Sequence, residues 1–313
     1  MASCLGANVT NKIPVSETVL ASYRFAFDNY LKLLGVTWAP ITMVFALMLW
    51  QLVPFMGDVN GLAAHNPSAA MGALGHVFIF EILSVVFLVI MTLGITMLAL
   101  GLRPRWPFLY LSFGSDFWRL LLGYFLFFVI LIVATLLISL VLGGIVGAIM
   151  FSVGRGNVGQ LSAGSAGYRG AVICLIYATM ALLFLRFAFL LPSVTISEKR
   201  IGLGRNWNLT HGNLWRLLVL LIALLVPLVV TGVLQMLFSR VVGGQALNYF
   251  DAVGSREASL AWSANTLRLY SVYWYLYIPF WILVAPIAYG VPICGAAIAY
   301  RQLSPGNPAD AFA

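Results

Sequence analysis

Residues 120–153 read LLLGYFLFFVILIVATLLISLVLGGIVGAIMFSV and contain no charged side chain. A helix needs about 20 mostly apolar residues to cross the roughly 30 Å hydrocarbon core of a bilayer. This stretch exceeds that length. Because a helix rises about 1.5 Å per residue, it should overshoot the hydrocarbon, and we expect it to tilt, or to break near Gly143 and Gly144. The stretch therefore predicts a transmembrane helix.

The rest of the chain has the same character. Of its 313 residues, 62% are apolar and 8% are charged, against about 45–50% and 25% in globular domains. The mean hydropathy is +1.00, and no stretch of about 100 residues is polar enough for a water-exposed domain, which excludes a soluble enzyme with one anchor. We predict an all-α membrane protein with six spans, at roughly 35–55, 76–101, 119–145, 170–191, 215–238 and 275–300.

The distribution of Lys and Arg predicts the orientation. Of the 17 basic residues, 11 fall on the side that holds both termini and five on the other side, with Arg186 near the end of span 4. Basic residues concentrate in cytoplasmic loops, so both termini should be cytoplasmic. The last span carries Pro279, Pro286 and Pro292, and interior prolines kink helices, so this span should be the least regular.

Three segments that enter odd-numbered spans share a pattern. The sequence YRFAFDNYLKLL at 23–34 aligns without a gap with WNLTHGNLWRLL at 207–218, and DFWRLL at 116–121 repeats the core of both. The Asn or Asp suits a helix start, and the aromatic residues and the base suit the headgroup level. One reading is an internal repeat. The other is that every entry into a membrane from the cytoplasm selects such residues.

The repeat reading predicts three helix-hairpin units, at about 16–103, 108–192 and 195–303. They would form a membrane domain at 16–304, between polar tails at 1–15 and 305–313. Parallel repeats predict pseudo-threefold symmetry about the membrane normal. Segments 16–32 and 193–212 would be interfacial amphipathic helices on the inner leaflet.

The segments FLLP at 189–192 and RNWNLTHGNLWR at 205–216 resemble a group of uncharacterised bacterial multi-span inner-membrane proteins. The group includes the membrane domain fused to some glycerophosphodiester phosphodiesterases. Residues 17–45 look like the N-terminal entry of the same group, and Asn206 replaces its usual Ser. The resemblance implies the fold and a location in the bacterial cytoplasmic membrane, but no catalytic residues.

Ionisable residues inside a membrane are candidates for function, and Glu81 and Arg186 are the two that come nearest to such a position. We expect Glu81 to be solvated or hydrogen-bonded between helices, with a proton- or ligand-binding role as the alternative. Arg186 should extend to the inner headgroups, because a long side chain near a helix end reaches the interface.

The sequence matches no other motif for metal binding, cofactor binding or catalysis in the context that the motif requires. A metal site would need His65, His76 and Asp58 or Glu81, at spacings that match no ligand motif. Residues 154–159 match G-x-G-x-x-G but follow a transmembrane helix rather than a strand, so we interpret them as a turn. No carboxylate pair shares a predicted face. We therefore expect no metal, no cofactor and no enzymatic activity.

The fourth connection, which joins predicted spans 4 and 5, concentrates basic and aromatic side chains. We predict that it lies along the inner leaflet and contacts anionic lipid or a partner protein through Lys199, Arg200, Arg205, Trp207, Trp215 and Arg216. Nucleic acid is not an expected partner, because the net charge of +8 is shared among loops. The function that these features favour is an organiser or accessory subunit of a membrane complex, with a transporter or lipid-handling protein as the alternative.

Overall fold

The structure is a computed structural model that describes residues 12–63, 67–102, 110–152, 174–243 and 256–304. These residues form helices and no strand. Within them, six helical stretches are long and apolar enough to cross a membrane: Tyr30–Trp50, Phe78–Ala99, Ser115–Val141, Cys174–Glu198, Leu214–Val241 and Leu269–Leu303. The protein is therefore an all-α multi-pass membrane protein, as the composition predicts.

The described residues begin with a short helix, and three long helices follow; four short segments then precede two more long helices and a last short one. In order, the elements are α1 (Val15–Asp28), α2 (Tyr30–Ala63), α3 (Pro67–Ala99), α4 (Ser115–Ser152), a helix at 174–183, the π-helix η1 (Phe184–Ala188), α6 (Leu191–Glu198), α7 (Leu203–Thr210), α8 (Leu214–Gly243), α10 (Arg256–Ala288) and α11 (Gly290–Leu303).

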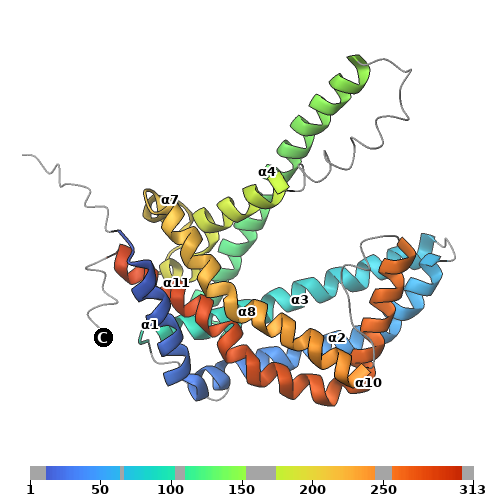
Figure 1. Ribbon diagram of the computed structural model, residues 1–313, viewed down its shortest axis with the longest axis horizontal. Helices are drawn as coiled ribbons and strands as arrows, with labels where there is room; N and C mark the ends of the chain where they lie inside the picture. Colours follow the sequence, from blue (N-terminus) through green and yellow to red (C-terminus); the bar gives the residue numbers. More distant parts are fainter. Residues whose placement is uncertain (1–11, 64–66, 103–109, 153–173, 244–255, 305–313) are drawn as a thin grey trace, which may run out of the picture.

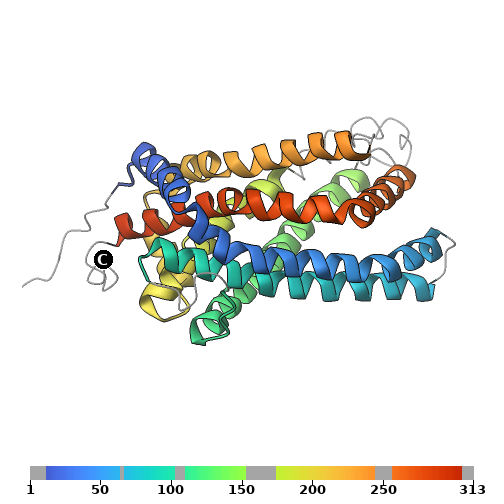
Figure 2. The ribbon, with the colours of Figure 1, turned by 90° about the horizontal axis from the view of Figure 1, so that it is seen from below.

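The long helices form two groups that meet at one end. Helix α2 packs against α3 and α10, and α10 also contacts α8. Helices α4 and 174–183 point away from that group, and we call them the α4 arm (Figure 1). Helices α1, α7 and α11 gather where the two groups meet, which we call the converging end (Figures 1 and 2). Both ends of the described chain lie there, where the Thr18 hydroxyl is 2.8 Å from Gln302 Oε1.

The core of the converging end is built around α6. Every residue from Leu191 to Ile196 is buried, and α6 contacts α3, α4 and α11. Pro192 suits the first turn of this helix, where the missing N–H needs no partner. The prediction of one interfacial helix over 193–212 is therefore wrong for its first part. Only α7 is amphipathic there, and it buries Asn206 and Thr210.

Two predictions about irregular spans have different outcomes. Helix α4 continues through Gly143 and Gly144 to Ser152, so the break, one of the two expected alternatives, is absent, and the tilt stays a prediction. Helical glycines cost only about 1 kcal/mol each. The last span is irregular, as its prolines predict. Its backbone leaves helical geometry at Tyr273 (φ −112°, ψ 22°), and α10 and α11 are separate helices that meet at Tyr289.

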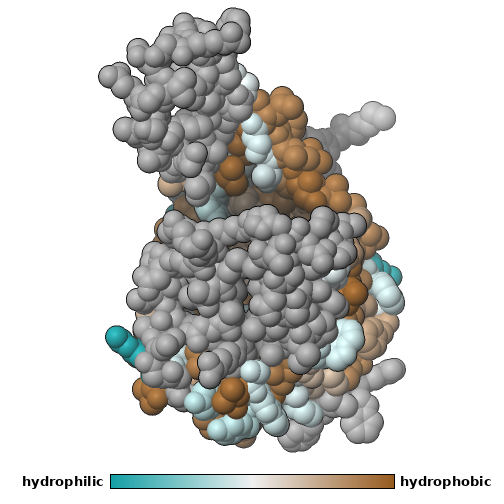
Figure 3. All heavy atoms as spheres, turned by 90° about the vertical axis from the view of Figure 1, so that its right-hand side faces the viewer, coloured by the Kyte–Doolittle hydropathy of each residue, from teal (hydrophilic) through white to brown (hydrophobic). Residues whose placement is uncertain are grey.

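Apolar side chains cover the outside of the spans. Only 11% of the most apolar stretch of α4 is buried, and brown, hydrophobic residues flank the arm in Figure 3. In α1 the small residues Thr18, Ser22 and Ala26 are buried, whereas Leu20 is 70% and Phe27 58% exposed. This arrangement suits a protein whose surroundings are as apolar as its core.

The three proposed repeats have partly similar elements. Helices α1 and α7 each precede a long apolar helix, but residues 110–114, before α4, are not helical. The threefold rotation stays a prediction.

Candidate functional site

The basic segment of the fourth connection lies at the converging end and is paired with two acidic side chains. Lys199 Nζ is 2.7 Å from Asp116 Oδ2, which joins the end of α6 to the start of α4. Arg205 Nε is 3.2 Å from Glu198 Oε1, and Arg200 also donates to Glu198. Two carboxylates thus hold three of the predicted contact residues in place.

The exposure of these pairs is unequal. The carboxylates of Asp116 and Glu198 are 15% and 13% exposed, whereas Lys199 and Arg200 are 56% and 63% exposed. The acids anchor the segment from inside, and the bases present N–H groups outward. The local charge remains positive because Asp116 is shared with Arg119, at 3.2 Å.

Glu198 is not among the predicted site residues, although its position directly before Lys199 and Arg200 was a signal for pairing. The Tyr300 hydroxyl of α11 also donates to Glu198 at 3.4 Å. Asp116 faces Tyr110, whose pKa is raised above its usual value chiefly by burial and further by the Asp116 charge. Both acids therefore link the segment to the rest of the converging end.

The shared motif before spans 1 and 3 makes the same local contact twice. Lys32 donates to Asn29 Oδ1 at 2.9 Å, and Arg119 donates to Asp116 Oδ1 at 3.2 Å. In both copies the base bonds to the Asn or Asp three residues before it. Side chains three apart are neighbours on a helix, so the spacing explains the contact.

The third copy of the motif has a different partner. Arg216 Nη1 donates to the carbonyl oxygen of Ile13 at 3.1 Å, and the Ile13 N–H donates to Asn213 Oδ1 at 3.4 Å. These two side chains hold the segment before α1 against the start of α8. Arg216 is itself exposed and Trp215 is 75% exposed, so their contact with lipid or a partner stays a prediction.

Arg186 lies in η1 and stacks on Trp207 of α7. Its guanidinium carbon is 4.7 Å from the ring centroid of Trp207, within the range of a cation–π contact. Its Nη1 is buried without a hydrogen-bond partner within the described residues. The indole thus holds the guanidinium beside α7, and the expectation that Arg186 extends to the inner headgroups stays a prediction. Nearby, Asn206 Nδ2 donates to the Phe187 carbonyl at 2.8 Å, so α7 and the π-helix support each other.

A cleft opens where the α4 arm meets the other helices. Its volume is about 500 Å³. Most of its lining side chains are apolar, and they come from α4, residues 174–193, α8 and α11: Phe127, Leu131, Tyr177, Met180, Ala181, Phe184, Leu221, Leu225, Pro292, Ile293 and Ala296 are among them. The polar residues Thr92, Tyr124 and Ser193 also line it. The cleft lies next to Pro192 and Pro292, where two spans are interrupted.

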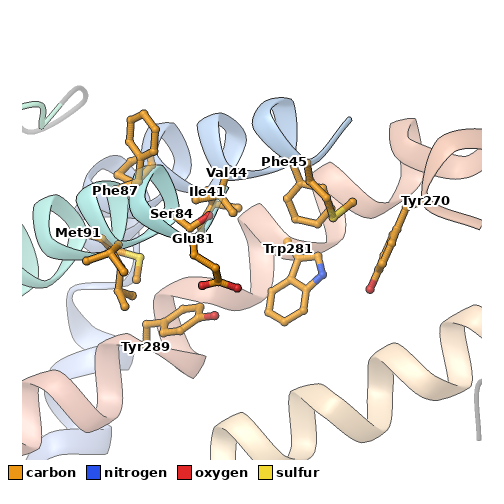
Figure 4. Close-up of a pocket in the computed structure, with 14 residues that line it drawn as sticks. Ile41, Val44, Phe45, Glu81, Ser84, Phe87, Met91, Tyr270, Trp281 and Tyr289 are labelled. Atoms are coloured by element: carbon orange, nitrogen blue, oxygen red, sulfur yellow. The ribbon is translucent and has the colours of Figure 1, made fainter. Parts of the chain in front are cut away.

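A second cavity, a groove of about 350 Å³, lies between α2, α3 and α10. Glu81 lines it with Ser84, and aromatic rings form much of its wall (Figure 4). Glu81 is exposed, and no hydrogen bond or ion pair joins it to another residue in the described ranges. The interhelical bond that we expected as one outcome is therefore not formed there.

The described residues hold no group of three His, Cys, Asp or Glu side chains that could bind a metal ion. The side chains of Asp58, His65 and His76 are not among those that the structure describes, and neither are residues 154–159. Cys294 is buried and Cys174 is exposed. No family model, curated protein or solved structure matches the chain. The resemblance of residues 189–216 to a bacterial membrane family thus stays a prediction.

Proposed function

We propose that the protein binds lipid in the cleft at the foot of the α4 arm, in the bacterial cytoplasmic membrane, with both termini in the cytoplasm. The proposal rests on the properties of the cleft. Its volume of about 500 Å³ falls within the roughly 300–1,000 Å³ of ligand pockets, which are likewise mostly apolar with a few polar groups. Acyl chains fit such walls because they supply dispersion contacts without leaving polar groups unpaired.

The charged residues beside the cleft support an anionic headgroup. Arg119 precedes Tyr124, a lining residue, by five positions on α4, which is about 7.5 Å along a helix axis. Arg119 and Lys199 flank Asp116 at the same end of α4. Arg119 thus lies within two helical turns of the cleft along the axis of α4, and about 140° round that axis from Tyr124.

A cleft-filling variant tests this proposal. Ala181 lines the cleft, and Ala178, one turn earlier on the same helix, is exposed and does not line it. We expect Ala181→Trp to lower the phospholipid that co-purifies in mild detergent, as measured by native mass spectrometry, because the indole occupies the space of an acyl chain. Ala178→Trp adds the same bulk elsewhere and should retain the wild-type lipid. Equal lipid in the two variants, both monodisperse, would contradict the proposal.

An accessory subunit of a membrane complex is the second candidate, supported by the exposed face of α4. Leu136 and Leu140, one turn apart, are 63% and 74% exposed, so a partner helix could pack there. Serine substitution at both positions should then remove a co-purifying membrane protein while the cleft keeps its lipid. Retention of every co-purifying protein would argue against this candidate.

A further inference from the structure

The groove between α2, α3 and α10 has a composition unlike that of the lipid cleft, and the two share no lining residue. We propose that this groove binds a monovalent organic cation with apolar substituents. The inference is independent of the proposed lipid function, because it rests on Glu81 and the aromatic rings around it.

The position of Glu81 is the first step. Glu81 precedes Ala99, at the end of α3, by 18 residues, which is about 27 Å along the helix. Glu81 therefore lies inside the apolar stretch Phe78–Ala99, close to its outer limit. Carboxylates within spans are costly and usually face a cavity, where they meet an ion or a partner group. Glu81 faces a cavity.

The walls of the groove are the second step. Phe45 comes from α2, Tyr270 and Trp281 from α10, and Tyr289 from the α10–α11 junction. Figure 4 shows the carboxylate of Glu81 in the space beside the rings of Trp281 and Tyr289. Aromatic faces attract cations, and Trp does so most strongly. A carboxylate beside such rings offers a cation both charge pairing and ring contacts.

The polar side chains that line the groove determine which class of cation it can bind. Besides Glu81, the polar residues that line the groove are Ser84, Tyr270, Tyr289 and Trp281. The Ser84 hydroxyl is buried, and the Tyr270 hydroxyl accepts a hydrogen bond from Gln235. Calcium needs about six to eight oxygen ligands, and zinc about four nitrogen, sulfur or oxygen ligands. One carboxylate cannot supply either set. An organic cation needs only one counter-charge, and its apolar substituents match the Met and aliphatic side chains of the same wall.

Two ions of equal shape and opposite charge test the proposal. Tetraphenylphosphonium and tetraphenylborate carry the same four phenyl groups, so an apolar groove without a role for charge would bind both. The protein would be placed in nanodiscs of zwitterionic phosphatidylcholine, and protein-free nanodiscs would give the partitioning background. We expect saturable binding of tetraphenylphosphonium above that background and none of tetraphenylborate.

Glu81→Gln then removes the charge and keeps the shape. We expect it to raise the Kd of tetraphenylphosphonium about tenfold. Glu17→Gln, which removes an exposed carboxylate of α1, should leave the Kd unchanged. Trp281→Leu should weaken binding by about threefold to tenfold, because the groove stays apolar but loses a cation–π face.

Three results would contradict the binding of an organic cation at Glu81. Equal binding of the two ions, or an unchanged Kd in a monodisperse Glu81→Gln variant, would overturn the proposal. A Kd raised equally by Glu17→Gln would also overturn it, because the effect would then be one of surface charge. Retained lipid in the cleft assay has no bearing on these results.

Discussion

Gly295 of α11 allows close contact with α8, and a methyl group there should destabilise the fold. An ideal Cβ on Gly295 would lie 2.3 Å from Leu224 Cδ1 and 2.8 Å from Cδ2, whereas carbon atoms pack at about 3.5–4.0 Å. Leu224 must therefore move by more than about 1 Å. Leu224 is fully buried, so its side chain must repack within the protein. Overpacking of this kind costs about 1–3 kcal/mol.

Gly232 of α8 is a matched control, because nothing lies within 4 Å of the Cβ position. Alanine in place of a helical glycine gains up to about 1 kcal/mol from helix propensity. Both Gly295→Ala and Gly232→Ala receive this gain. The difference between their free energies of unfolding therefore isolates the overpacking cost, about 1–3 kcal/mol.

Thermal unfolding of both variants in detergent, followed by far-ultraviolet circular dichroism, measures the difference. We expect Gly232→Ala to keep or raise the Tm and Gly295→Ala to lower it by a few degrees relative to the control. Leu224→Ala should cost less in the Gly295→Ala background than in the wild type, because the new methyl partly fills the cavity. Equal Tm shifts for the two glycine variants would refute the close packing of α11 on α8.

Two further predictions concern a buried hydrogen bond and the topology. Ser239 Oγ donates to the Gln235 carbonyl at 2.8 Å, so the Tyr277 hydroxyl, 2.6 Å away, must be the donor in their contact. Ser239→Ala leaves the Tyr277 hydroxyl without a partner and should lower the free energy of unfolding by about 1–3 kcal/mol. Tyr277→Phe should lower it by only about 0.6–1.7 kcal/mol. If chemical unfolding showed the reverse order, this donor assignment would be contradicted. Reporter fusions after Gly61 and after Arg301 should read outside and inside respectively, because of the charge distribution; either opposite result would reverse the orientation.

The sequence predicts those features of this protein that depend on local composition. Each span is recognisable because about 20 consecutive apolar residues suffice to favour the bilayer, whatever they contact. The interruption of the last span at Tyr289 follows from Pro292, three residues later, since proline removes a donor from its own helix. Helix α10 itself continues through Pro279 and Pro286. The contact between Asp116 and Arg119 follows from their spacing on one helix.

Contacts between distant segments depend on the tertiary structure alone. Lys199 and Asp116 are 83 residues apart, and nothing in either segment identifies the other as its partner. The cleft of the α4 arm and the groove of Glu81 are likewise built from several helices. Burial of α6 could not be distinguished from an interfacial position, because its sequence has no strongly amphipathic pattern.

The physical reason is the solvent. In water, the apolar face of a helix shows where the protein interior lies. In a bilayer, lipid tails are as apolar as Leu, so a span such as α4 is apolar on every face and its sequence does not show which face contacts protein. The sequence of this protein therefore determines what crosses the membrane and where charge stays outside it. Close packing of small residues such as Gly295 and a few polar contacts decide how the spans assemble.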